Sequence, residues 1–284
     1  IEKWSQRLMP ALFVLFAGLI IYVLTQEGAM AGLKVYLVPD FSQMSDPKLI
    51  VSAMGQAFFS MSLGVGTMLV YGSYISGDEN LPLVGALVTL TDMGVAVLAG
   101  LLVLPATFVA QHLGVTITGE GGSLIAGPDL IFKVLPALFD GMGSAGLLVG
   151  LGFFALMSIA AVTSSISMLE VPVSYAVEAH KVDRLKATWL VGLLIFAVSA
   201  VISANFDSLF GFVITLTTER AQPLLSMVVC IFAGWVFHRN SILQEIQAGN
   251  PDVEQGLFWK IWPGYVKFLC PLLILVTLAQ GFIG

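Results

Sequence analysis

The hydrophobic positions of this chain gather in seven long runs, separated by segments that are richer in polar residues. Each run holds about 20 residues or more, enough to cross a hydrocarbon core of about 30 Å at 1.5 Å per residue. The period-2 alternation of a membrane-spanning barrel is absent. Since every peptide group inside lipid needs an internal hydrogen-bond partner, the runs predict helices, and the chain is expected to be an all-α, polytopic transmembrane bundle. The predicted spans lie at about 8–25, 52–74, 82–111, 144–177, 186–203, 208–237 and 260–282.

Composition supports a membrane protein and excludes other classes. Hydrophobic residues make up 57% of the 284 residues and charged residues 11%, less than half of the roughly 25% of a soluble domain. The net charge is −6 and no basic run suits a nucleic acid, so we expect no nucleic-acid partner. Cys230 and Cys270 lie inside apolar runs without metal or redox spacing, which favours packing residues over a disulfide.

The loops give an orientation and two external segments. Two long polar connections stand out, at 26–51 and 112–143, and the second contains a short apolar helix candidate at Gly127–Phe139. Counting basic residues in the loops favours a cytoplasmic N-terminus, because cytoplasmic loops carry an excess of Lys and Arg. We therefore expect a multi-pass protein of the inner cell membrane with both long loops outside. The inner side then collects Lys3, Arg7, Lys181, Arg184, Lys186, Arg239 and Lys260, and the outer side Lys34, Lys48 and Lys133.

The start of the chain predicts a piece of a longer protein. The first residue is Ile1 rather than an initiator Met, and the first apolar run begins within a few residues of it. The C-terminus directly follows another apolar run. We interpret the chain as a fragment, or as one part of a processed protein.

Polar residues at membrane depth are expensive, and so they indicate function. Ser60–Gly66 places two glycines and two serines in the middle of the second run. Each glycine costs a helix about 1 kcal/mol relative to alanine. Two interpretations stand equally: a small-residue packing face on a continuous helix, or a broken helix whose free carbonyls and amides line a site, which is allowed only next to protein or a water-filled cavity.

Two other features carry oxygen atoms into the membrane. Thr163, Ser164 and Ser165 form a triplet in the fourth run; back-bonding to helix carbonyls is the favoured interpretation, and cation ligation the alternative. Asp92 has no Lys or Arg within a helical turn. Unpaired, it would be costly or protonated, and a bound cation would resolve this. The pattern assigns no role to four further charged residues, which are Glu170, Glu178, Glu219 and Arg220.

These residues resemble a known family. Gly55–Gly66 (GQAFFSMSLGVG) followed by Tyr71–Tyr74 (YGSY) is similar to the sixth segment of the neurotransmitter:sodium symporter family, which has the fold of the bacterial leucine transporter. Ala161–Ser167 (AVTSSIS) resembles the eighth segment, and Gly127–Phe132 with Leu135 and Pro136 resembles the fourth external loop. The likeness covers essentially the whole chain, aligned to segments five to eleven of twelve.

The resemblance implies sodium-coupled symport of an amino acid by alternating access, and no enzyme activity. The family's core is two inverted repeats, with the site at mid-membrane where the first and sixth helices are unwound, and the family is itself a standard example of this architecture. The expected partners are an amino acid, Na⁺ and the bilayer. The resemblance assigns substrate contacts to Phe59, Ser60, Ser62, Val65, Ser164 and Met168, a first sodium site to Ser60 and Asp92, and a second to Ala160, Thr163 and Ser164.

Several positions depart from the family's pattern or extend it. Many members have Asn in place of Asp92, and some of these need a chloride ion; a carboxylate here implies chloride-independent transport. Phe210 stands where the family's outer gate has an Asp, and Asp207, one turn earlier, is the possible substitute. Glu178 matches the inner-gate acid, and Tyr74 is placed among the gating residues.

The resemblance also divides the chain and suggests a substrate. We expect a single transmembrane domain over 1–284, with the fifth helix and an external loop at 1–51, the second inverted repeat at 52–237 and an accessory helix at 238–284. The four helices that would precede them are missing partners. Val65 is smaller than the Phe common at its position, which favours an apolar, bulky or aromatic substrate.

There are two alternatives to a transporter. A haem-carrying respiratory subunit needs paired histidines inside the membrane, whereas His112, His180 and His238 all lie at or near the ends of runs. A relative of the same fold that binds or regulates without transporting stays open.

Overall fold

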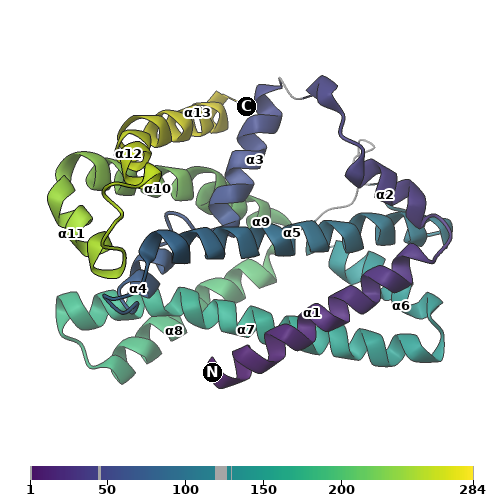
Figure 1. The fold of residues 1–284 in the computed structure, drawn as a ribbon. Coiled ribbons are helices and arrows are strands. Elements are labelled where there is room, and N and C mark those ends of the chain that lie inside the picture. The colour runs from purple at the N-terminus through teal and green to yellow at the C-terminus, as the bar shows by residue number, and fades with distance from the viewer. Residues whose placement is uncertain (1, 44–45, 119–126, 129, 284) are drawn as a thin grey trace. The chain divides into compact units, whose positions relative to one another are not determined.

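A computed structural model describes residues 2–43, 46–118, 127–128 and 130–283, and nearly all of them are helical (Figure 1). The α-helices, in chain order, are α1 (Glu2–Leu24), α2 (Ala29–Leu37), α3 (Pro47–Ser60), α4 (Thr67–Gly72), α5 (Leu81–His112), α6 (Leu135–Gly141), α7 (Ser144–His180), α8 (Arg184–Ala204), α9 (Phe206–Ile214), α10 (Gln222–Ile231), α11 (Arg239–Gly249), α12 (Leu257–Gly264) and α13 (Cys270–Ile283). A short 3₁₀ turn covers Phe41–Gln43, and π-helical turns cover Leu130–Val134, Thr215–Ala221, Phe232–Val236 and Tyr265–Leu269.

The predicted spans match these helices closely, with one informative exception. Among the described residues, four helices are long and apolar enough to cross a membrane without interruption, and they are Leu81–His112, Ser144–His180, Arg184–Ala204 and Leu257–Ala279. Pro10–Leu24 and Phe206–Val236 qualify as parts of bent pairs, which turn by 113° into α2 and by 99° into α11. The predicted run 52–74 is different, because it is broken between α3 and α4.

The short helix predicted at Gly127–Phe139 is present as a π-helical turn that continues into α6. Pro136, which has no N–H to donate, is the second residue of α6 and follows this π-helical turn. Asp129 lies outside the described residues. The division at 1–51, 52–237 and 238–284 stays a prediction.

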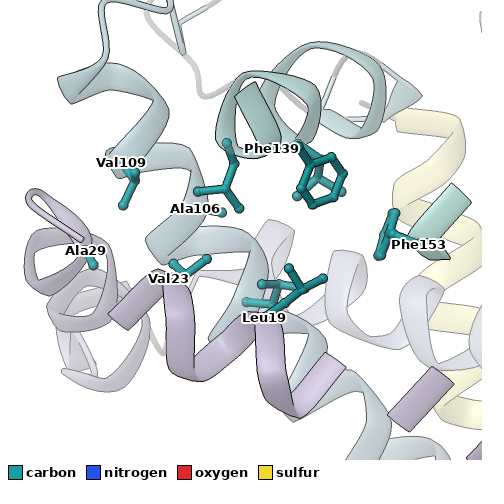
Figure 2. Packing of buried hydrophobic residues seen from close by; sticks show 10 residues of the cluster. Leu19, Val23, Ala29, Ala106, Val109, Phe139 and Phe153 are labelled. Atoms are coloured by element: carbon teal, nitrogen blue, oxygen red, sulfur yellow. The ribbon is translucent and has the colours of Figure 1, made fainter. Parts of the chain in front are cut away.

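The chain separates into two compact units, and each has its own interior. Unit 1 contains residues 1–41 and 93–165, and unit 2 contains residues 42–92 and 166–284. In unit 1, side chains from α1, α5, α6 and α7 form one apolar cluster, and Figure 2 shows Leu19 and Val23 of α1 beside Ala106 of α5 and Phe139 of α6. The backbone of α2 lies directly on α5, since a Cβ added to Gly32 would be 2.6 Å from the Leu104 carbonyl oxygen.

Unit 2 is organised around α10, which packs against both α13 and α3. A smaller apolar cluster of Ile246, Val253 and Trp259 secures α11 to the start of α12. Both cysteines belong to this unit and are free and partly buried, in agreement with their predicted packing role. The π-helical turn Thr215–Ala221, which contains Glu219 and Arg220, directly precedes α10. Such turns add a residue to the helix and often mark functional positions.

Candidate functional site

The break between α3 and α4 is the centre of the candidate site. Helix α3 ends at Ser60 and α4 begins at Thr67. Within the six intervening residues, φ is +51° at Ser62, +80° at Gly64 and +92° at Gly66. Left-handed backbone suits glycine, because it has no Cβ to collide with the carbonyl. The break in the helix is therefore present and the continuous packing face is wrong, whereas a site lined by the freed backbone groups stays a prediction.

The break is pressed against α10. A Cβ built on Gly64 would be 2.3 Å from the Gln222 carbonyl oxygen and 2.8 Å from Ser226 Oγ. The side-chain oxygens of Thr67, Gln222 and Ser226 are buried without a hydrogen-bond partner among the described residues. Buried polar groups in native proteins nearly always have a partner. Several polar atoms around the break are thus available to bind water or other polar groups.

Sequence reasoning did not single out Gln222 and Ser226. They lie in the predicted span 208–237 as isolated polar residues of an apolar run. The rule that polar residues at membrane depth deserve an explanation would have found them. What it could not supply is their position against Gly64.

Ser60 and Asp92 are brought together at the end of α3. Ser60 Oγ lies 2.7 Å from Asp92 Oδ1 and 2.8 Å from Oδ2, and it donates its hydrogen to the carboxylate. An ionised carboxylate offers about four lone-pair positions, so this bond leaves capacity for a cation. Asp92 is partly buried, and its carboxylate is bonded to a hydroxyl rather than to a basic side chain.

The second predicted cation group lies on α7. Thr163 Oγ1 donates to the Ala160 carbonyl at 2.8 Å, and Ser165 Oγ donates to the Ala161 carbonyl at 2.9 Å. The back-bonding favoured by the sequence is therefore present. It also holds the Thr163 hydroxyl oxygen and the Ala160 carbonyl oxygen close together. The Ser164 side chain is exposed.

The residues assigned to substrate contact are accessible or lie in the break itself. Phe59 is 50% exposed and Met168 49%. Ser62 and Val65 are partly buried within the turn. A cavity of about 440 Å³ adjoins the break, but it takes Phe58 and Gly64 into its lining and none of these four residues. The cavity and the predicted substrate contacts therefore involve different residues of the break.

A polar network that the sequence did not reveal connects α7 to its neighbours. Tyr74 Oη donates to Glu170 Oε1 at 2.8 Å. Arg184 Nη2 lies 2.8 Å from both oxygens of the same carboxylate, and Ser174 Oγ donates to it at 3.0 Å. Glu170, which had no assigned role, thus joins the predicted gating residue Tyr74 to α8. The sequence carried no signal for this pair, since 14 positions separate its members.

The other two predicted gating residues are exposed. Glu178 lies near the end of α7. Asp207 stands in the first turn of α9, where a negative charge is favourable to the helix dipole. Phe210, one turn later, stacks on Phe206 with ring centroids 4.3 Å apart.

Comparison with known proteins decides the family. The model of the sodium:neurotransmitter symporter family matches residues 4–284. The chain belongs to that family. Relatives include YhdH of Bacillus subtilis (strain 168), described as an uncharacterized sodium-dependent transporter, which is 32% identical over 287 residues, covering 98% of this chain and 60% of the relative. An uncharacterized sodium-dependent transporter of Haemophilus influenzae is 33% identical, with 97% and 59% covered.

A solved structure confirms the fold. The crystal structure of MhsT in complex with L-phenylalanine superposes with a TM-score of 0.84 at 34% identity, covering 97% of this chain and 61% of that one. The predicted all-α, leucine-transporter-like fold is confirmed. The matched relatives are transporters rather than enzymes. This chain is a multi-pass membrane protein and spans about 60% of their length.

Replacing Gly64 by Ala tests the packing of the break. The new Cβ would meet the Gln222 carbonyl and would also occupy a left-handed backbone, which together cost about 2–4 kcal/mol. We expect the thermal unfolding midpoint of the purified protein to fall by several degrees. Gly55→Ala is the matched control, because nothing lies within 4 Å of a Cβ at that position of α3. Equal midpoints for Gly64→Ala and the wild type would contradict the described packing.

Proposed function

We propose that the complete protein couples the uptake of an amino acid to Na⁺ by alternating access. The main support for this proposal is the helix break at 61–66 with the Ser60–Asp92 pair at its edge. Peptide groups freed at a break need partners, and a substrate's ammonium and carboxylate groups can supply them. Membership of the symporter family supports the same function.

The first sodium ion is assigned to Ser60 and Asp92. A hard monovalent cation favours oxygen ligands, and the hydroxyl and carboxylate lie within 2.8 Å of each other. The negative charge of Asp92 would balance the ion without help from an anion. Transport should therefore proceed without chloride.

The second sodium ion is assigned to Ala160, Thr163 and Ser164. The bond from Thr163 to the Ala160 carbonyl holds two of these oxygens 2.8 Å apart. They carry no net charge, so a cation here would be held by oxygen dipoles rather than by an ion pair.

The substrate is assigned to the break and to α7. Backbone groups at the break would hold the polar end of an amino acid, with Ser60, Ser62 and Ser164 adding hydroxyls. Phe59, Val65 and Met168 offer apolar contact to the side chain. We infer an apolar, bulky or aromatic amino acid, and the phenylalanine bound to MhsT, a relative 34% identical, supports this class.

The inner gate is assigned to the network around Glu170. Tyr74 lies two residues after α4, whereas Arg184 begins α8, so Glu170 links the far end of the broken helix to a continuous one. Glu178 on α7 and Asp207 on α9 are assigned to the inner and outer gates. The distribution of Lys and Arg supports the inner cell membrane with a cytoplasmic N-terminus for this chain.

The sodium assignment predicts two separable results in proteoliposomes containing the complete protein. Ser60→Ala should raise the Na⁺ concentration for half-maximal uptake about tenfold, the loss expected for one ligand to a charged group. Uptake by the wild type should be unchanged when gluconate replaces chloride, whereas Asp92→Asn should become dependent on chloride. Asp207→Asn, which removes an exposed charge, should keep chloride independence.

Chloride-dependent uptake by the wild type would contradict the role given to Asp92. Sodium-dependent binding of radiolabelled amino acids without any uptake would instead favour a relative that binds but does not transport.

The substrate class can be tested by competition. We expect tryptophan, phenylalanine and leucine to inhibit uptake at concentrations at least tenfold below those of glycine or glutamate, because each buried CH₂ group adds about 0.8 kcal/mol. The measurement is sodium-dependent uptake in the presence of each competitor. Stronger inhibition by glycine or glutamate would rule out an apolar pocket.

The gate can be tested by a double-mutant cycle. Glu170→Gln and Arg184→Gln should each lower uptake a few-fold, a modest effect because Arg184 is 62% exposed and solvent screens the pair. The double variant should be no worse than either single one, since the pair acts as a unit. Glu178→Gln combined with Arg184→Gln is the control, where we expect additive effects. Additive effects for Glu170 and Arg184 would refute the coupling.

A further inference from the structure

Lys267 interrupts the last apolar helix of the chain. It lies inside the span Leu257–Ala279, about 10 Å along the helix from the start of the predicted run at 260. An ammonium group at such a depth is costly unless it finds a partner or reaches the membrane interface. The position of its side chain is therefore informative.

The structure places the ammonium group on an aromatic clamp. Lys267 Nζ lies 4.3 Å from the ring centroid of Trp235 and 5.8 Å from that of Phe268. The two rings meet edge to face, with centroids 5.7 Å apart. Faces of aromatic rings attract cations, most strongly in the case of Trp.

Backbone contacts hold the clamp in place. Trp235 Nε1 donates a hydrogen bond to the Lys267 carbonyl at 3.1 Å. A Cβ on Gly234 would lie 3.0 Å from Lys267 Cα, so the backbones of the two helical segments come very close at this point. Lys267 and Trp235 are thus fixed to each other by backbone as well as by charge.

Trp235 indicates the level that the ammonium group reaches. It lies one residue before Val236, the last helical residue before the chain turns into α11. Tryptophan at the end of a span is typical of the membrane interface. Trp235 is 58% exposed and Phe268 62%. The side chain therefore extends from within the span toward the headgroups, as lysines near helix ends do.

The ammonium group of Lys267 has no carboxylate beside it in the described part of the chain. Among the residues that the structure describes, no carboxylate lies within ion-pair distance of Lys267. Arg239, which opens α11, sits 5.5 Å from the ring centroid of Trp259, two helical turns before Lys267. Lys260 adds a third positive charge to the same end. A basic group between spans at the membrane interface suits the phosphate of a lipid.

We propose that Lys267, positioned by Trp235 and Phe268, binds the phosphate of an anionic phospholipid in the leaflet on the side of α11. The aromatic rings would lie against the upper acyl chains, while the ammonium group meets the phosphate. This site is independent of the proposed transport function, because it involves none of the residues assigned to sodium or substrate.

Native mass spectrometry of the complete protein in detergent tests the proposal, by titration with phosphatidylglycerol or phosphatidylcholine. The wild type should retain phosphatidylglycerol in preference, and Lys267→Gln should weaken its binding about fivefold, as expected for one lysine at an anionic surface. Lys267→Arg should keep it. Lys34→Gln, which removes one exposed positive charge from α2, should have no effect.

Three results would overturn the proposal. They are equal binding by the wild type and Lys267→Gln, equal retention of the two lipids by the wild type, and displacement of phosphatidylglycerol by millimolar inorganic phosphate. Should Lys267→Gln fail to fold, Trp235→Leu removes the clamp but leaves the charge. It should weaken phosphatidylglycerol binding by a smaller factor, and unchanged binding would count equally against the proposal.

Discussion

A peptide group inside hydrocarbon must have a hydrogen-bond partner, and the candidate site depends on how this chain meets that requirement. Six of its seven apolar runs form continuous helices, in which the backbone groups bond to one another. In the run at 52–74, the helix is interrupted over Met61–Gly66, and the regular pattern of backbone hydrogen bonds is lost there. The peptide and hydroxyl groups exposed there need partners from neighbouring helices, from water, or from ligands. A break at this depth is stable only because other parts of the molecule support it.

That support has two components in unit 2. One is the close approach of α10, where the Gln222 carbonyl leaves no room for a side chain at Gly64. The other is Asp92, whose carboxylate accepts the hydroxyl of Ser60 at the last residue of α3. The first fixes the backbone of the break, and the second puts a negative charge beside it. The close backbone packing and the negative charge thus involve the same few residues at the break.

Three charged residues within the spans, Asp92, Glu170 and Lys267, are stabilised in three different ways. Asp92 accepts a hydroxyl and keeps lone pairs for a cation. Glu170 is paired with Arg184 and also receives Tyr74 and Ser174, so its carboxylate is well supplied with donors. Lys267 rests on aromatic rings and extends toward the interface. The three arrangements differ in what they allow. The Glu170–Arg184 ion pair can separate, and the Asp92 carboxylate can accept a further ligand. The rings beside Lys267 position its charge at a surface.

The sequence by itself determined the all-α membrane fold, because long apolar runs in lipid have no alternative to helices that satisfy their own backbone. It also identified Ser60, Asp92 and Thr163 as unusual, since polar atoms at that depth stand out in one dimension. Tertiary structure alone decided that the Ser60–Gly66 run breaks, that Gln222 lies against it, and that Glu170 pairs with Arg184. Tolerance of a glycine-rich segment depends on what packs beside it, and pairs of residues 14 or more positions apart meet only when the helices have been placed. The sequence shows which polar residues are costly to bury in the membrane. Which residues become their partners depends on how the helices pack.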